Sequence, residues 1–280
     1  MSDSYDRRIT AARPDLAAAH LKGVVAAERY REGRIKQLAV ASIGLRSASG
    51  LDAPLETELL FGEIFTVYEL KNDWVWGQGA LDSHVGYAPA DAFSDTLTVP
   101  THRVTARATP LLIAPDVKQP SAAILPMNAK LTIVEAGPRF SRIAGDRYVF
   151  SDHIAQLAAH AQDWVAIAET FIAVPYVWGG KTFAGIDCSG LIQTALEAAG
   201  IAAPRDTDLM ETALGESIAL DAPLQRGDLI FWKGHVGAML DGARLIHASA
   251  LAMQVVIEDF PTARARIEAD GLPVRTIKRL

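Results

Sequence analysis

The sequence predicts an α+β chain in which two small β-barrels precede a domain of mixed helices and strands. Three observations support this expectation. Short runs of β-branched and aromatic residues, separated by turn formers, fill residues 35–99, which is the pattern of a small all-β domain. Residues 100–154 repeat that pattern in a weaker form, as an internal duplication does. From residue 155 onward, a helical periodicity gives way to further short strands.

Residues 1–34 precede the first barrel as an alanine-rich segment. Pro14 and Asp15 stand at the start of a stretch that reaches about Ala27, and we interpret this stretch as helical. Its expected task is to pack against the rest of the chain.

The two predicted barrels correspond to each other in sequence. Residues 123–135 lie where residues 58–69 lie in the first barrel, and residues 140–143 correspond in the same way to residues 74–76. Tandem barrels are therefore expected, and both resemble bacterial SH3-type domains.

The C-terminal domain, residues 155–280, is expected to combine helices with an antiparallel sheet. Apolar residues are spaced for one helical face over residues 154–173. A second helix is predicted over residues 188–199, where Gly200 is placed to end it. Further strands are expected over residues 228–232, 235–240, 244–248 and 253–257, a short helix over 261–268 and a last strand over 273–279.

Composition limits the classes of function. Half of the residues are hydrophobic and 21% are charged, as in a soluble globular protein. The formal net charge of −6 argues against general electrostatic binding of nucleic acid, because such binding depends on Lys and Arg neutralising phosphates. No stretch approaches the roughly 20 apolar residues that span a bilayer, and the polar N-terminus shows no secretion signal. We therefore expect a cytoplasmic protein that binds neither nucleic acid nor membrane.

Cys188 is the only cysteine in the sequence, so an intramolecular disulfide is impossible, which fits a reducing compartment. It lies where a turn runs into the predicted second helix. The partial positive charge of a helix N-terminus lowers the pKa of a thiol. The free N–H groups there can also stabilise the oxyanion of a tetrahedral intermediate. These features make Cys188 a candidate nucleophile.

A nucleophilic cysteine needs a base, and two histidines fall on neighbouring predicted strands of the same domain. His235 opens one strand, and His247 lies on the next, after a hairpin at Asp241 and Gly242. Adjacent antiparallel strands can bring the two rings within hydrogen-bond reach. Cys188 and the two histidines would then act as nucleophile, base and orienting group.

The residues alone leave other interpretations open. A lone cysteine is often a small buried hydrophobic residue, and a histidine on a strand is often an ordinary core or surface residue. A metal site is a further alternative, but one Cys and two His without a nearby Asp or Glu do not form a standard zinc spacing. We therefore expect neither a metal ion nor another cofactor.

Four short motifs follow one another along the C-terminal domain. They are Tyr176-Val-Trp-Gly-Gly, Asp187-Cys-Ser-Gly-Leu, Arg226-Gly-Asp-Leu-Ile-Phe and Gly234-His-Val-Gly. Together they resemble the signature of the NlpC/P60 peptidases, over about residues 155–280. The resemblance implies a papain-like α+β catalytic domain in which Cys188 is the nucleophile, His235 the base and His247 the residue that orients the base.

The resemblance also implies a substrate. The chain is most similar to family members of the dipeptidyl-peptidase VI type, which carry SH3-type domains before the catalytic domain. These enzymes cut murein peptides between D-γ-glutamate and a diamino acid, and they require a free N-terminal L-alanine. By the same resemblance, Asp206 would receive the substrate ammonium, and Thr207 would stand where a serine is usual.

Further substrate contacts are implied in the same way. Glu63 in the first barrel matches a second acidic position of those enzymes, and His84 lies where they commonly have a tyrosine that closes the pocket. A carboxylate is needed there because the desolvation of a buried ammonium otherwise opposes binding. The remaining residues expected to line the cleft are Tyr176, Trp178, Asp187 and Ser189.

The sequence thus predicts a cysteine peptidase that recycles murein peptides by hydrolysing the bond between γ-D-Glu and meso-diaminopimelate or L-lysine. Two alternatives remain. One is an exported endopeptidase or amidase that acts on intact peptidoglycan, and the other is a non-catalytic module that binds wall peptides through its SH3-type domains. Neither the oligomeric state nor the preference between the two diamino acids follows from the sequence.

Overall fold

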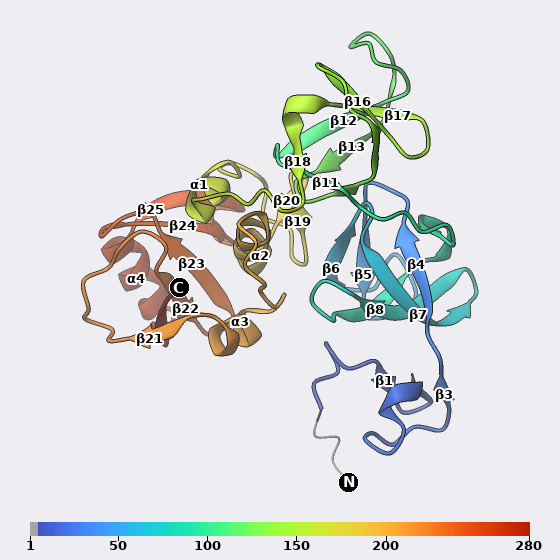
Figure 1. Cartoon of the computed structure of the whole chain (residues 1–280). Helices are drawn as coiled ribbons and strands as arrows, with labels where there is room; N and C mark the ends of the chain where they lie inside the picture. The colour runs from blue at the N-terminus through green and yellow to red at the C-terminus, as the bar shows by residue number, and fades with distance from the viewer. Residues whose placement is uncertain (1–4) are drawn as a thin grey trace. The chain divides into compact units, whose positions relative to one another are not determined.

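The computed structural model describes residues 5–280, and the polar start of the chain, residues 1–4, lies outside the described part. The chain divides into two compact units, residues 1–157 and 158–280, which run from blue to yellow-green and from yellow to red in Figure 1. Among the described residues, no helix is long and apolar enough to cross a membrane.

Unit 1 consists almost entirely of short β-strands. Its N-terminal segment holds β1 (Ala12–Arg13), β2 (Leu16–Ala18), the 3-10 helix η1 (Ala19–Leu21) and β3 (Tyr30–Arg31). The next part holds β4 (Arg34–Leu38), β5 (Ser42–Arg46), β6 (Leu55–Leu60), β7 (Ile64–Lys71), β8 (Trp74–Gly79), β9 (Val85–Pro89), η2 (Ala90–Ala92) and β10 (Phe93–Ser94). The last part holds β11 (His102–Val104), β12 (Ala108–Leu112), β13 (Ser121–Pro126), β14 (Lys130–Leu131), β15 (Ile133–Glu135), β16 (Phe140–Ile143), β17 (Arg147–Phe150), η3 (Ser151–His153) and β18 (Ile154–Gln156).

The same strand order occurs twice in unit 1. The first large sheet has the order β10-β4-β7-β8-β9-β5-β6, and the second has the order β13-β12-β17-β16-β15. Within them, β7-β8-β9-β5-β6 and β15-β16-β17-β12-β13 follow the same path with antiparallel neighbours throughout. That the second sheet is an SH3-type domain stays a prediction.

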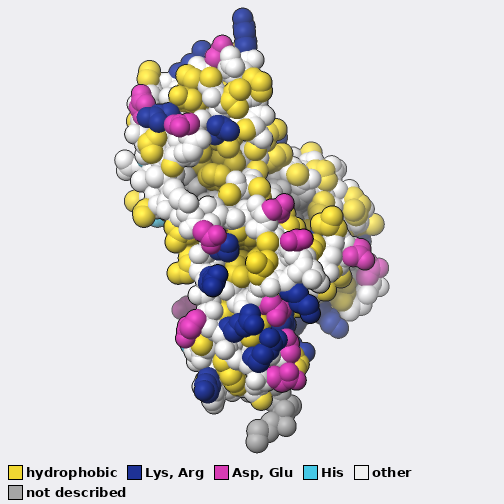
Figure 2. Space-filling model, turned by 90° about the vertical axis from the view of Figure 1, so that its right-hand side faces the viewer, with side chains coloured by type: hydrophobic (Ala, Val, Ile, Leu, Met, Phe, Trp, Pro, Cys, Tyr) yellow, Lys and Arg dark blue, Asp and Glu magenta, His cyan; other side chains and the backbone are white. Residues whose placement is uncertain are grey.

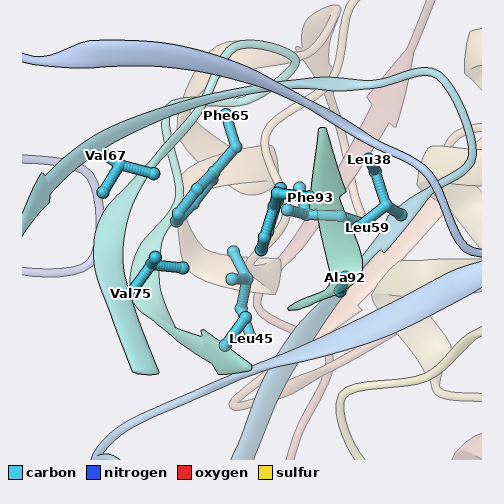
Figure 3. Close-up of a cluster of buried hydrophobic side chains, with 9 residues drawn as sticks. Leu38, Leu45, Leu59, Phe65, Val67, Val75, Ala92 and Phe93 are labelled. Atoms are coloured by element: carbon cyan, nitrogen blue, oxygen red, sulfur yellow. The ribbon is translucent and has the colours of Figure 1, made fainter. Parts of the chain in front are cut away.

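The core of the first large sheet is a cluster of aliphatic side chains around two phenylalanines (Figure 3). The Phe65 and Phe93 rings are stacked with their centroids 5.1 Å apart. Phe65 and Val67 are buried while Thr66 between them is not, which is the alternation of a strand with one face toward a core. The buried members of the cluster are Leu38, Leu45, Leu59, Phe65, Val67, Val75, Ala88, Ala92 and Phe93.

The N-terminal segment is extended, so the helix predicted over residues 14–27 is wrong. β2 pairs antiparallel with β1 and parallel with β3. Leu16 and Ala18 are buried in one hydrophobic cluster with Trp76, whereas Ala17 is buried in another. This alternation has the period of a strand. Burial of both faces outweighs the intrinsic helical preference of alanine, which is a weak effect in so short a segment.

Unit 2 combines a six-stranded antiparallel sheet with four helices. The strand order is β21-β26-β22-β23-β24-β25, and β19 and β20 form a separate hairpin. The helices are α1 (Trp164–Glu169), α2 (Cys188–Ala198), α3 (Thr207–Ala213) and α4 (Phe260–Ala269). The strands are β19 (Lys181–Thr182), β20 (Gly185–Ile186), β21 (Glu216–Ile218), β22 (Leu229–Trp232), β23 (His235–Met239), β24 (Arg244–Ser249), β25 (Gln254–Asp259) and β26 (Thr276–Arg279).

The predicted helix over residues 154–173 is wrong at its start. Residues 154–156 form β18, which pairs with β11, and α1 occupies only the middle of the predicted range. The Asp163 carboxylate begins this helix by accepting the N–H groups of Val165 at 3.0 Å and Ala166 at 3.1 Å, as an N-cap does. The apolar spacing therefore joined a strand and a short helix into one apparent helical face.

The other elements predicted for this domain form close to their expected ranges. α2 lies against β23 and β24, and α4 packs over a cluster that includes Trp232, Met239 and Leu245. The sequence patterns did not predict α3, β21 or the β19–β20 hairpin. These elements are short, so they carry little periodicity of their own.

Basic side chains gather near the N-terminal end of the chain on the face shown in Figure 2, with acidic side chains among them. Arg13 donates to Asp15 at 2.9 Å and to Glu69 at 2.6 Å, and Lys36 lies 2.8 Å from Asp95. These ion pairs neutralise part of the basic charge locally. Cations that already have carboxylate partners are poor candidates for binding phosphates.

We expect the extended N-terminal segment to stabilise unit 1 through Leu16, which is fully buried. Leu16→Ala should reduce the free energy of unfolding by about 2–5 kcal/mol, because it removes buried methyl groups and leaves a cavity. Urea unfolding followed by tryptophan fluorescence measures this loss. Val24→Ala is the control because Val24 is 77% exposed. Equal stability of the two variants would contradict the packing of this segment.

Candidate active site

Cys188 is the first residue of α2 and is only 5% exposed. The helix begins there because Asp187 caps it, with its carboxylate accepting the Gly190 N–H at 2.7 Å. Gly190 is required by close packing, since a Cβ at this position would lie 2.3 Å from the carbonyl oxygen of Gly180. The Asp-Cys-Ser-Gly sequence thus places the sulfur at a helix N-terminus.

Two groups from other elements donate toward the Cys188 sulfur. One is the backbone N–H of Val236 in β23, and the other is the hydroxyl of Thr207 at the start of α3. Val236 directly follows His235 in the chain. The sulfur of α2 is therefore held beside the first residues of the strand that carries the predicted base.

The two predicted histidines are hydrogen-bonded to each other. His235 Nε2 lies 2.8 Å from His247 Nδ1, and the ring centroids are 5.0 Å apart with the rings nearly perpendicular. Gly237 allows this approach, because a Cβ there would lie 3.2 Å from the Cβ of His247. The pairing of β23 with β24 thus produces the contact that the strand pattern predicted.

Glu258 and Arg266 extend this pair into a longer polar chain that sequence reasoning missed. His247 Nε2 lies 2.6 Å from Glu258 Oε2, and an Arg266 Nη2 lies 2.6 Å from the same oxygen. Glu258 is on β25, two residues beyond Val256, the partner of His247 in the β24–β25 register. The period of two along a strand puts Glu258 on the same face as His247. Only the register reveals this, and no local sequence pattern specifies it.

A buried ion pair between Arg205 and Asp187 supports the start of the helix that carries Cys188. Arg205 donates to both carboxylate oxygens of Asp187, at 3.0 and 2.8 Å, and to the Ser189 hydroxyl at 2.7 Å. It also donates to the carbonyl oxygen of Gly180 at 3.3 Å. No role for Arg205 was predicted from the sequence. Its side chain is 2% exposed, so its task is to position neighbours.

Asp187 and Ser189 flank Cys188 in the chain. Both were expected to line the cleft, but both are buried. Besides Arg205 and the Gly190 N–H, the Asp187 carboxylate accepts the Gly179 N–H at 2.8 Å. Their polar atoms are engaged inside the protein, which gives both a positioning role beside Cys188, and their part in lining the cleft stays a prediction.

Tyr176 and Trp178 lie on the loop before β19. Tyr176 is partly buried, and Trp178 is 66% exposed, which is unusual for so large an apolar ring. Burial raises the pKa of the Tyr176 phenol, and the Cys188 thiolate, when it forms, and the Asp187 carboxylate act in the same direction. The hydroxyl therefore stays protonated and remains a hydrogen-bond donor near the sulfur.

Asp206 lies between two anchored residues, Arg205 and Thr207. It occupies the N-cap position of α3, yet its side chain does not cap that helix. Arg205 on one side is locked to Asp187, and Thr207 on the other side donates toward the sulfur. The backbone of Asp206 is thus held between two residues that contact the surroundings of Cys188, and its part in binding substrate stays a prediction.

Glu63 and His84 belong to unit 1. Both are buried there, and a carboxylate oxygen of Glu63 accepts the N–H of Leu60 at 3.1 Å. The backbone N–H of His84 donates to Asp82 at 3.0 Å. Their part in binding substrate stays a prediction.

The resting charges of the cysteine and the base differ from the expected ones. Burial raises the pKa of the Cys188 thiol, and the charge of Asp187 adds to this effect, so the prediction that the helix start lowers this pKa is wrong. Burial lowers the pKa of His235, and His247 and Arg266 act in the same direction. The resting pair is thus a neutral thiol and a neutral imidazole.

Two family profiles match the chain. One, described as the NlpC/P60 family, covers residues 173–266, and the other, described as a bacterial dipeptidyl-peptidase Sh3 domain, covers residues 45–93. Cys188, His235 and His247 all lie within the first range. The chain is a cysteine peptidase of the NlpC/P60 family. Its N-terminal part contains an SH3-like domain.

Relatives of this NlpC/P60 peptidase match it over most of their length. It is 28% identical over 223 residues to the dipeptidyl-peptidase 6 of Lysinibacillus sphaericus, which covers 71% of this chain and 82% of that protein. It is 28% identical over 235 residues to the gamma-D-glutamyl-L-lysine dipeptidyl-peptidase of Bacillus cereus, covering 72% and 70%. The crystal structure of an NlpC/P60 family protein from Bacillus cereus is similar with a TM-score of 0.76 at 22% identity, covering 88% of this chain and 99% of that one. The fold is therefore the papain-like fold with an SH3-like N-terminal domain.

Among residues 5–280, no group of three or more His, Cys, Asp or Glu side chains is arranged to hold a metal ion. The polar groups around the sulfur are instead those of nucleophilic catalysis.

We expect the Arg205–Asp187 pair to be critical for stability of the peptidase domain. Arg205→Met should reduce the free energy of unfolding by about 3–5 kcal/mol, because it leaves a buried carboxylate without its cation. Arg226→Met is the matched control, since Arg226 pairs with Asp163 and Glu169 at the surface and such pairs contribute about 0–1 kcal/mol. Equal losses in urea unfolding would show that Arg205 does not hold the site together.

The alkylation rate of Cys188 by iodoacetamide should keep rising with pH through 9.0, the ordinary value from which its pKa is raised. The thiolate is the reacting form, and below the pKa its fraction grows roughly tenfold per pH unit. The urea-unfolded chain, with the same single cysteine, is the control and should level off at lower pH. A plateau near neutral pH in the folded protein would instead indicate a stable thiolate–imidazolium pair.

Proposed function

We propose that this peptidase hydrolyses the bond between γ-D-glutamate and a following diamino acid in murein-derived peptides that carry a free N-terminal L-alanine. The observation that supports hydrolysis by a thiol nucleophile is the placement of Cys188 against β23, the strand that begins with one of two hydrogen-bonded histidines. The substrate class is supported by relatives named dipeptidyl-peptidase 6 and gamma-D-glutamyl-L-lysine dipeptidyl-peptidase, which match 71% and 72% of this chain.

The first half of the reaction begins with proton transfer from the Cys188 thiol to His235. The sulfur attacks the γ-carbonyl carbon, and the negative charge that develops on the carbonyl oxygen is stabilised by N–H groups at the start of α2 and by the Tyr176 hydroxyl. His235 then gives its proton to the leaving amine of the diamino acid. The product is a thioester between Cys188 and the L-Ala-γ-D-Glu fragment.

The second half of the reaction regenerates the enzyme. His235, neutral again, removes a proton from a water molecule, which attacks the thioester carbon. Collapse of the tetrahedral intermediate releases the dipeptide and returns the proton to the sulfur. His247 keeps the His235 ring in place through both halves, through its 2.8 Å hydrogen bond.

Recognition of the free amine is assigned to Asp206. An ammonium group that leaves water needs a carboxylate partner, and Asp206 is held between the anchored residues Arg205 and Thr207. A requirement for a free amine selects released peptides over intact wall, which supports a role in cytoplasmic recycling.

The substrate assignment is tested with L-Ala-γ-D-Glu-meso-diaminopimelate and its L-lysine counterpart. Wild-type enzyme should release L-Ala-γ-D-Glu, whereas Cys188→Ala should reduce the rate by at least about 10³-fold, because the nucleophile is lost. Mass spectrometry of the products measures this. Equal product from both proteins would eliminate the thiol mechanism.

The specificity assignment has its own control. N-acetylation of the substrate should lower kcat/KM on the order of a thousandfold, and Asp206→Asn should lower it for the free-amine peptide but not for the acetylated one. Unchanged cleavage of the acetylated peptide would indicate a hydrolase of intact wall instead.

A further inference from the structure

We propose that Glu258, held by Arg266, is a positioning residue that sets the proton arrangement of the two catalytic histidines. Through His247 it keeps the Nδ1 atom of His235 unprotonated and able to take the proton of the Cys188 thiol. The inference rests on the proposed roles of Cys188 and His235 but not on the identity of the substrate.

The geometry forms a continuous chain across two strands and a helix. His235 Nε2 is 2.8 Å from His247 Nδ1, and His247 Nε2 is 2.6 Å from Glu258 Oε2. Arg266 on α4 lies 2.6 Å from the same carboxylate oxygen. His247 is 2% exposed, so its two ring nitrogens have these protein groups as partners rather than bulk water.

The direction of the hydrogen bonds follows from the last member of the chain. A carboxylate paired with Arg266 is an acceptor only, so His247 donates its Nε2–H to Glu258. The neutral His247 ring then has a lone pair at Nδ1, which accepts the Nε2–H of His235. The proton of neutral His235 is thereby assigned to Nε2, and its Nδ1 carries the lone pair that a general base needs.

The charge of Glu258 also acts on the pKa of His247. The groups that face the histidine pair are Glu258 from β25 and Arg266 from α4, and they oppose each other: Glu258 raises the pKa of His247, while Arg266 lowers the pKa values of both rings. Glu258 contacts the His247 ring directly, whereas Arg266 donates its hydrogen bond to Glu258. The Glu258 charge therefore offsets part of the effect of Arg266 on the pKa of His247.

The rate of Cys188 alkylation by iodoacetamide at pH 7 tests the proposal without any substrate. Glu258→Met removes the acceptor and should slow alkylation about 10- to 100-fold, the effect of losing a hydrogen bond to a charged group. Glu258→Gln keeps a carbonyl oxygen and should recover part of the rate. Glu268→Met is the matched control and should leave the rate unchanged. Glu268 forms an ion pair of similar exposure with Arg264, 2.8 Å away on α4, the helix that also carries Arg266.

Nitrogen-15 NMR of the histidine rings at neutral pH provides a second readout. Wild type should show both His235 and His247 protonated at Nε2, and Glu258→Met should show His247 shifting toward Nδ1 protonation. Wild-type His247 protonated at Nδ1, or equal alkylation rates in Glu258→Met and Glu268→Met, would overturn the proposal. If the substrate assignment alone is wrong, wild type will fail to cleave the murein peptide while the Glu258 effects on alkylation and tautomer persist.

Discussion

The active site depends on the buried ion pair between Arg205 and Asp187. The guanidinium joins the loop at residues 179–180, the start of α2 and the segment that carries Asp206. Burying two charges costs several kcal/mol unless their hydrogen bonds are satisfied, and here the carboxylate accepts from Arg205 and from two backbone N–H groups. Since Asp187 also caps α2, the position of the Cys188 sulfur is determined before substrate binds.

The sulfur lies where the start of α2 meets β23 of the sheet. Burial keeps the thiol protonated and the His235 ring neutral, so the attacking thiolate must be generated during the reaction. A neutral resting pair reduces adventitious oxidation of the only cysteine, because the thiolate is the reactive form. The cost is a greater need for a well-placed base, which the hydrogen-bonded chain from His235 through His247 to Glu258 supplies.

The sequence patterns succeeded where structure is local and failed where it is not. The start of α2, the strands that carry His235 and His247, and the helix near residues 261–268 all follow from caps, turns and short-range periodicity. Residues 14–27 failed because the propensity of alanine was outweighed by burial of both faces of β2 against partners far away in sequence. The helix predicted over residues 154–173 failed because a strand and a capped short helix have compatible apolar spacing.

The sequence by itself determined the family, the nucleophile candidate and the two histidines, because the motifs around Cys188 and His235 are contiguous in the chain and His247 lies on the next predicted strand. Only the tertiary structure decided what surrounds them. The β24–β25 register brings Glu258 to His247, and folding buries Arg205 against Asp187. Burial also reverses the expected shift of the thiol pKa. Desolvation and cross-strand neighbours are properties of the packed domain, so no local run of residues encodes them.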